Sequence, residues 1–183
     1  MNYAFLLVIL IISAALIADD QTEDTKIDST DRSNDEAVLQ AHRYFAADFF
    51  NKCWDLIDKA DRTVEDDLQM IHRAHASRAH WQVVGTPDNH AVGEWQISHV
   101  YAILNKLEPA MYHAQACLDI CQKNQIGGFN LGFAYEALAR AEYMIGNQDQ
   151  AEKYINLGKT AANDVKKIED RNYLLKELNN IIK

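Results

Sequence analysis

Histidine is the residue type in this sequence best suited to chemistry, with seven copies among 183 residues. His75 lies on a segment with helical periodicity, and Glu94 and His99 lie on the next such segment. Antiparallel packing would bring these three together as two imidazoles and a carboxylate, a ligand set for a divalent transition metal. No His-Glu-x-x-His motif is present, so hydrogen-bonded surface histidines are the other interpretation. One hypothesis is therefore a small metal- or histidine-dependent enzyme with its site between the second and third predicted helices.

The three cysteines indicate neither a disulfide scaffold nor a nucleophile. Three cannot all pair within one chain, and Cys117 and Cys121 lie one helical turn apart, too far for an unstrained bridge. We expect both, with Cys53, to be small buried hydrophobic side chains. Gly127-Gly128 is not followed by the Lys and Ser or Thr of a phosphate-binding loop, so it indicates a helix end. The sequence therefore predicts no cofactor.

Acidic residues outnumber basic ones, and the formal net charge is −9. Nucleic-acid binding needs clustered Lys and Arg, so we expect no nucleic-acid partner. Residues 19–36 contain eight acidic residues, two basic ones and a single large apolar residue, Ile27. Such a segment cannot bury enough apolar surface to offset its conformational entropy. It predicts an acidic disordered linker over residues 19–35, followed by a folded domain over residues 36–183.

Ahead of this linker, residues 1–18 form an apolar segment that resembles a signal sequence or an anchor. The run from Ala4 to Ala18 is interrupted only by Ser13 and would rise about 22 Å as a helix, short of the roughly 30 Å hydrocarbon core. Its length favours a signal sequence over a membrane span, but no Lys or Arg precedes it. A cleaved signal, an uncleaved anchor and a segment without a targeting role all stay open. The protein is exported or membrane-associated through residues 1–18 in the first two cases and cytoplasmic in the third.

After residue 36 the apolar residues recur with the 3.6-residue period of an α-helix, and no segment sustains the alternation of a strand. Thr63 and Asp66 have the spacing of a capping box at a helix start. Asp88 is the predicted cap of the third helix, and Pro109 is predicted at the first position of the fourth. The sequence thus predicts an all-α antiparallel stack of helix hairpins. About seven helices are expected, over residues 38–56, 64–84, 89–104, 109–126, 130–145, 151–162 and 173–182.

Two helix–turn–helix junctions can be superimposed with an offset of 41 residues. Small residues at fixed distances from a turn let two helix axes approach closely, and their recurrence indicates a helical repeat. Four positions match between the two copies: a residue four positions before the turn residue, the turn residue itself, and two small residues after it. They are Tyr101, Asn105, Ala110 and Cys117 in one copy, and Glu142, Gly146, Ala151 and Gly158 in the other.

The segment from Ala139 to Ala151, with Gly146 in its turn, resembles the middle of a tetratricopeptide repeat. The offset of 41 residues is longer than the family's usual 34, and Asn105 replaces the turn glycine in the earlier copy. Shorter stretches, such as those around Trp95 and Phe133, resemble a group of bacterial tetratricopeptide-like proteins of unassigned function. The resemblance implies a right-handed superhelix of helix hairpins and a binding role rather than a reaction.

In tetratricopeptide repeats the first helix of each pair lines a concave face. The resemblance therefore implies a protein- or peptide-binding module without catalytic activity, which is the leading hypothesis. The alternative is that Trp95 and Phe133 belong to the core and that Glu136 and Arg140 form a surface ion pair. A homodimer is also possible, because an open stack has uncovered end faces. The groove would expose aromatic and charged side chains on its two central helices: Trp95, His99, Phe133, Glu136, Arg140 and Tyr143.

Overall fold

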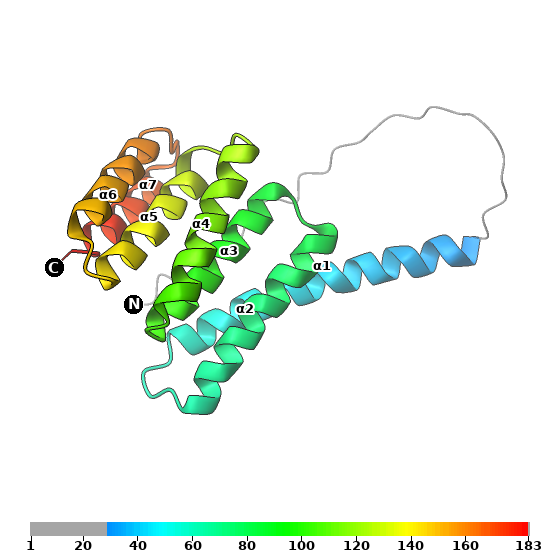
Figure 1. Ribbon diagram of the computed structural model, residues 1–183. Helices are drawn as coiled ribbons and strands as arrows, with labels where there is room; N and C mark the ends of the chain where they lie inside the picture. The colour runs from blue at the N-terminus through cyan, green and yellow to red at the C-terminus, as the bar shows by residue number, and fades with distance from the viewer. Residues whose placement is uncertain (1–28, 183) are drawn as a thin grey trace.

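The computed structural model describes residues 29–182, which form seven α-helices and no strand (Figure 1). The all-α class and the number of helices are therefore as predicted for this part of the chain. The apolar segment 1–18 and residues 19–28 of the predicted linker lie outside the described residues. None of the described helices combines the length and the apolar character needed to cross a membrane. The helices are α1 (Ser29–Ile57), α2 (Val64–Val84), α3 (Pro87–Ile103), α4 (Leu107–Lys123), α5 (Gly128–Met144), α6 (Gln148–Ala162) and α7 (Ile168–Asn179).

α1 begins earlier than the sequence pattern indicates. Residues 29–35 were predicted as the end of a disordered linker, but they form the first turns of this 29-residue helix. A helix of this length rises about 43 Å, and its first turns extend beyond the stack in Figure 1. Residues 35 and 36 are exposed, as the acidic composition of residues 19–36 indicates. Their helical backbone conformation does not follow from that composition.

The turns between helices follow local chemistry, with two corrections. Thr63 and Asp66 form the predicted capping box, because the Asp66 carboxylate accepts from the Thr63 backbone N–H and the Asp66 N–H donates to the Thr63 hydroxyl. Thr86 rather than Asp88 caps α3, since Pro87 already occupies its first position. Pro109 is the third residue of α4 rather than the first. A proline is tolerated anywhere in the first turn, because the N–H that it lacks would have no hydrogen-bond partner within the helix.

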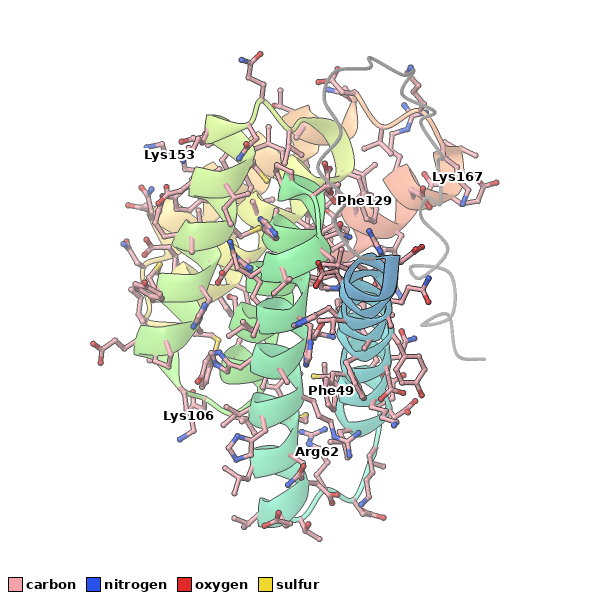
Figure 2. The ribbon with its side chains drawn as sticks, turned by 90° about the vertical axis from the view of Figure 1, so that its right-hand side faces the viewer. Phe49, Arg62, Lys106, Phe129, Lys153 and Lys167 are labelled. Carbon is pink, nitrogen blue, oxygen red and sulfur yellow. The ribbon has the colours of Figure 1, made fainter. Side chains whose placement is uncertain are left out.

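Three successive hairpins, α1–α2, α3–α4 and α5–α6, follow one another across the molecule, with α7 packed on α5 and α6 (Figure 1). α3 also contacts α5, and α5 contacts α7. The Gln96 side-chain amide of α3 donates to the Phe50 carbonyl of α1 over 3.1 Å, so successive odd-numbered helices are neighbours. Figure 2 shows α1 and α7 on one side of the stack, while Lys106 at the start of α4 and Lys153 of α6 project from the other. We call the side formed by α1, α3, α5 and α7 the odd-helix face.

Small side chains lie where the helices of a hairpin cross, as the repeat pattern predicts. Ser98 is buried in α3 and its hydroxyl donates to the Ala110 carbonyl of α4 over 2.8 Å. The equivalent residues 41 positions later, Ala139 and Ala151, are fully buried between α5 and α6. α7 packs closely as well, because a Cβ on Gly132 of α5 would lie 2.3 Å from a methyl carbon of Leu174. Each of the pairs α3–α4, α5–α6 and α5–α7 is therefore closely packed through small residues.

Candidate functional site

A buried polar contact joins the α3–α4 hairpin to the α5–α6 hairpin at positions that match in the 41-residue offset of the sequence. The Trp95 indole N–H in α3 donates to the Glu136 carboxylate in α5 over 3.0 Å, and the two residues are 41 positions apart. Both side chains are buried, with exposed fractions of 6% for Trp95 and 5% for Glu136. A buried carboxylate is costly unless it is hydrogen-bonded and paired with a charge. Glu136 therefore needs a cation beside it.

Arg140, one helical turn after Glu136, supplies that cation. Its Nε donates to one Glu136 oxygen over 3.0 Å, and a terminal guanidinium nitrogen contacts the other oxygen, so the pair is bidentate. Another guanidinium nitrogen contacts Nδ1 of His99, again 41 positions away. Burial, and then the charge of Arg140, hold the pKa of His99 well below its usual value. His99 is therefore a neutral acceptor for the Arg140 N–H.

Aromatic rings extend this contact across the odd-helix face. The His99 ring stacks on Trp95, with ring centroids 5.5 Å apart, and Trp54 of α1 lies 5.6 Å from His99. Phe133 of α5 meets the Trp95 ring edge-on at 5.1 Å. Tyr173 of α7 lies 5.7 Å from Phe133. All four odd-numbered helices thus contribute to one row, the odd-face cluster: Trp54, Trp95, His99, Phe133, Glu136, Arg140 and Tyr173.

The electrostatic surroundings of Tyr173 connect the two ends of this row. Burial raises the pKa of Tyr173 to about 12, with further upward contributions from the charges of Glu177, Glu136 and Asp58 and an opposing one from Arg140. Asp58 follows the last residue of α1, whereas Tyr173 lies in α7. The charge of Asp58, just after α1, therefore contributes to the raised pKa of Tyr173 in α7.

The predicted groove contains five of the seven cluster residues, and for Trp95 and Phe133 the structure agrees with the alternative that places them in the core. Trp95, Phe133 and Glu136 are buried rather than lining an open groove, because α3 and α5 pack against each other through these side chains. His99, Arg140 and Tyr143 are partly exposed. The two residues that the sequence reasoning missed are Trp54 and Tyr173. Trp54 directly follows Cys53, which belongs to the apolar stripe predicted as the buried face of the first helix. A large aromatic residue just beside that stripe is the sequence signal that could have identified it.

The structure does not assemble the predicted metal set of His75, Glu94 and His99. His99 belongs to the odd-face cluster, whereas the His75 Nε2 atom lies 3.0 Å from the Tyr101 hydroxyl. Glu94 is held by Arg78 at 2.9 Å and by His113 at 2.7 Å. In residues 29–182 no three His, Cys, Asp or Glu side chains are grouped so as to hold a metal ion. The metal hypothesis is therefore wrong for these three residues.

Glu94 instead belongs to a polar network between α2, α3 and α4. Burial alone would raise the pKa of Glu94, but the hydrogen bond from His113 and the charge of Arg78 lower it below its ordinary value. Burial, and then His113, lower the pKa of His75, whose ring centroid lies 5.4 Å from that of His113. His113 was missed by the sequence reasoning because only packing of α4 on α3 brings it to Glu94. The network is a structural link between three helices.

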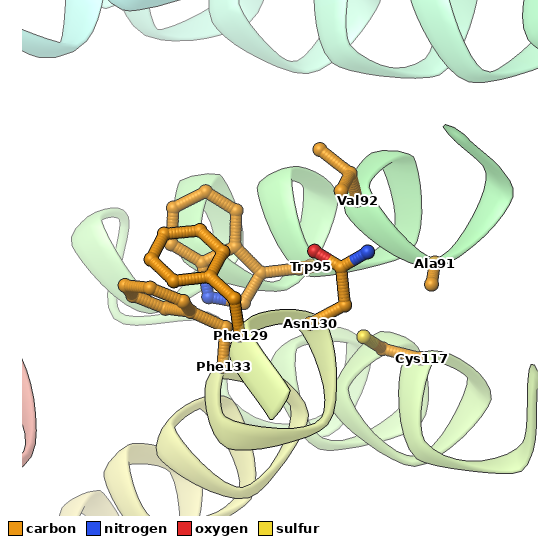
Figure 3. Close-up of a pocket in the computed structure, with 7 residues that line it drawn as sticks. All are labelled: Ala91, Val92, Trp95, Cys117, Phe129, Asn130 and Phe133. Carbon is orange, nitrogen blue, oxygen red and sulfur yellow. The ribbon is translucent and has the colours of Figure 1, made fainter. Parts of the chain in front are cut away.

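A crevice opens beside the aromatic row but is small. Figure 3 shows Phe129, Phe133 and Trp95 clustered at one end of it and Cys117 at the other. Its cavity volume is about 10 Å³, which is roughly the space of one water molecule. Ligands larger than water would therefore have to bind on the face rather than within it.

The cysteines are buried, as predicted. Burial raises the pKa of Cys53 to about 12. A hydrogen bond with Cys121, followed by burial, raises the pKa of Cys117 well above its usual value. Cys53 and Cys117 are therefore thiols at neutral pH, which makes them poor nucleophiles.

Comparisons of the chain with protein-family models, with characterised proteins and with solved structures find no match. The contacts described above are accordingly the basis for a functional proposal.

Proposed function

We propose that the protein is a tetratricopeptide-like module that binds a protein or peptide segment on its odd-helix face. In this proposal α1–α6 are three repeat hairpins in a right-handed superhelix, and α7 is the closing helix. Contacts between successive odd-numbered helices support it, as does the 41-residue offset between α3 and α5. Asn105 and Gly146, the equivalent turn residues, both adopt left-handed backbone conformations, with φ of 54° and 84°. Shared turn geometry is what a repeated hairpin requires.

The observation that carries a binding role is the continuity of the odd-face cluster. Its rings come from α1, α3, α5 and α7, and each ring contacts the next. Buried contacts of Glu136 fix the positions of Trp95 and Arg140 beneath this surface. Trp54, His99, Arg140 and Tyr173 stay partly exposed above it. A rigid surface of partly exposed aromatic rings loses little entropy when a partner docks, which favours binding.

Catalysis has less support at this face, because its titratable groups are occupied by one another. Glu136 accepts hydrogen bonds from both Trp95 and Arg140. His99 is the acceptor for Arg140 and is kept neutral by burial. Neither group is positioned to exchange a proton with a bound substrate, since a general base must reach the substrate with its acceptor atom.

The test compares a variant of the odd-helix face with one of the opposite side. Immobilised wild-type protein captures partners from the native cell extract, and the captured partner is then titrated against Trp54→Ala and Tyr112→Ala. Trp54 is partly exposed on α1, whereas Tyr112 is 70% exposed on α4. We expect Trp54→Ala to weaken binding about five- to thirtyfold, which corresponds to an aromatic contact of about 1–2 kcal/mol, and Tyr112→Ala to leave it unchanged.

Two controls make the outcome decisive. Circular dichroism checks that both variants keep the helical fold, and light scattering separates partner binding from formation of a homodimer. Unchanged affinity of a folded Trp54→Ala variant would place the binding surface elsewhere. The buried Trp95 is unsuitable for this test, because its truncation would also disturb the contact between α3 and α5.

A further inference from the structure

Two histidines from different helices meet outside the odd-face cluster. His42 of α1 and His80 of α2 are 38 residues apart in the chain, yet their Nδ1 atoms lie 3.0 Å apart. Both side chains are partly exposed, so a small ion can reach them from solvent. A hydrogen bond between two imidazoles needs one ring to donate its Nδ1–H and the other to accept with its Nδ1 lone pair. The two Nδ1 atoms therefore face one another.

The backbone beside this histidine pair is held in position. About one helical turn away, the Ser77 hydroxyl of α2 donates to the Ala46 carbonyl of α1 over 2.8 Å, and both residues are fully buried. This contact fixes the placement of α1 against α2 close to the histidines. The His80 ring also lies against two aromatic rings of α1, with centroids 5.5 Å from Phe45 and 5.9 Å from Phe49. The pair is thus preorganised by its surroundings.

The spacing of the two nitrogen atoms fits a pair of ligands on one metal ion. An imidazole nitrogen lies about 2.0–2.1 Å from a bound divalent transition metal. Two such bonds at a right angle place their nitrogens about 2.9 Å apart, and two bonds at the tetrahedral angle place them about 3.3 Å apart. The observed separation of 3.0 Å is closer to the right-angle value. Right angles between neighbouring ligands are typical of square-planar Cu²⁺ sites.

The protonation of the pair is compatible with a metal. Burial, and then the charge of His42, lower the pKa of His80, so its ring is neutral at neutral pH, which is the form that binds metals. In the hydrogen-bonded pair, one ring carries its proton on Nδ1. Metal binding requires this ring to lose the Nδ1 proton to water and to gain one from water at Nε2. The ring stays neutral, and this exchange of tautomers consumes no proton.

From this geometry we propose that His42 and His80 form a surface site for Cu²⁺, which binds both Nδ1 atoms in place of the proton that they share. No three His, Cys, Asp or Glu side chains of residues 29–182 are grouped around a common point, so water fills the other coordination positions. Among first-row divalent ions, Cu²⁺ forms the most stable complexes with nitrogen ligands. The inference goes beyond the proposed function, because neither histidine belongs to the odd-face cluster.

The experiment titrates CuCl₂ into metal-free full-length protein and into two single variants, His42→Gln and His80→Gln. A glutamine amide can still hydrogen-bond to the other histidine, and circular dichroism checks that each variant is folded. Electron paramagnetic resonance reports the nitrogen ligands of the copper, and calorimetry reports its affinity. We expect one Cu²⁺ per wild-type chain with two nitrogen ligands. Each variant should bind at least about tenfold more weakly, because loss of a side chain that merely orients a metal ligand already costs about 10–100-fold.

His72→Gln is the matched control. It removes an exposed imidazole from the same helix, α2, and leaves the histidine pair intact, so it should keep wild-type affinity. Equal affinity of the wild type and the two pair variants, or an equal loss in His72→Gln, would mean that copper binds elsewhere on the chain. Either result overturns the inference, as does a wild-type spectrum with fewer than two nitrogen ligands.

A second measurement needs no variant. Zn²⁺ is diamagnetic and also binds imidazole nitrogens, so ¹⁵N spectra of the histidine rings can follow the tautomers of His42 and His80 as Zn²⁺ is added. We expect one of the two rings to carry its proton on Nδ1 without metal, and both to carry it on Nε2 with metal. Tautomers that do not change overturn the inference. These results are independent of the Trp54→Ala titration, which alone decides whether the odd-helix face binds a partner.

Discussion

Replacing Glu136 by Gln is the sharpest test of how the odd-face cluster is held together. The amide keeps the size of the side chain but removes the charge that balances Arg140. Removal of one partner of a buried ion pair costs about 3–5 kcal/mol. The Arg140 side chain is 16% exposed whereas that of Glu136 is 6% exposed, so water recovers part of the loss. We therefore expect Glu136→Gln to lower the free energy of unfolding by about 2–4 kcal/mol, or the melting temperature by roughly 6–12 °C.

Urea denaturation followed by circular dichroism measures this loss. The control is Asp170→Asn, which removes the same charge from an exposed pair with Lys167 at 3.3 Å and should cost less than about 0.5 kcal/mol. The double variant Glu136→Gln/Arg140→Gln should regain at least half of the single loss, because no unbalanced charge stays buried. If Glu136→Gln matched Asp170→Asn, or if the double variant lost the sum of both singles, the charge balance would not be what holds these helices together.

Three further predictions concern stability. Gly132→Ala should lower the free energy of unfolding by about 1–2 kcal/mol, because crowding against α7 exceeds the gain in helix propensity; Gly127→Ala, with open space around it, should stay within about 0.5 kcal/mol in the same urea titration. The pKa values of His75 and His99 are lowered in the folded state, so the unfolded chain binds more protons than the folded one below about pH 6.5. The free energy of unfolding should therefore fall there by up to about 2.7 kcal/mol per pH unit. A urea midpoint that does not change between about pH 7 and pH 5.5 would contradict this. Asn105→Val should cost about 1–2 kcal/mol because of its left-handed backbone, while Asn105→Gly should cost nothing measurable by thermal denaturation.

Helix number and turn positions could be predicted because they depend on neighbouring residues. Thr63 and Asp66 fix the start of α2 through their own hydrogen bonds, whatever the rest of the chain does. Asn105 and Gly146 end their helices through a backbone conformation that Asn and Gly adopt readily. The small residues at the hairpin crossings were recognisable for a similar reason, since their distance from the turn is fixed.

The site was harder to predict, because helical periodicity gives the residues of a face but not what covers that face. Trp95 and Phe133 share the predicted face, yet the contact between α3 and α5 buries them. His99 was grouped with His75 because their helices are consecutive, whereas its ring packs on Trp54 from α1. Tyr173 enters the cluster only because α7 folds back onto α5. Each of these contacts depends on a rotation of one helix against another that no local signal specifies.

The contacts of Trp95 with Glu136 and of His99 with Arg140 join each residue to its own counterpart in the following hairpin. Were the two hairpins identical in sequence, indole would meet indole, and a buried carboxylate would meet a second carboxylate that repels it. Divergence between the copies is thus a condition for their adhesion, and the hairpins are not interchangeable parts. Exchanging α3–α4 with α5–α6 would keep the composition and the helices of the chain. It would, however, place Glu136 and Arg140 beside α1, and Trp95 and His99 beside α7, where neither pair would meet the side chains that it contacts now.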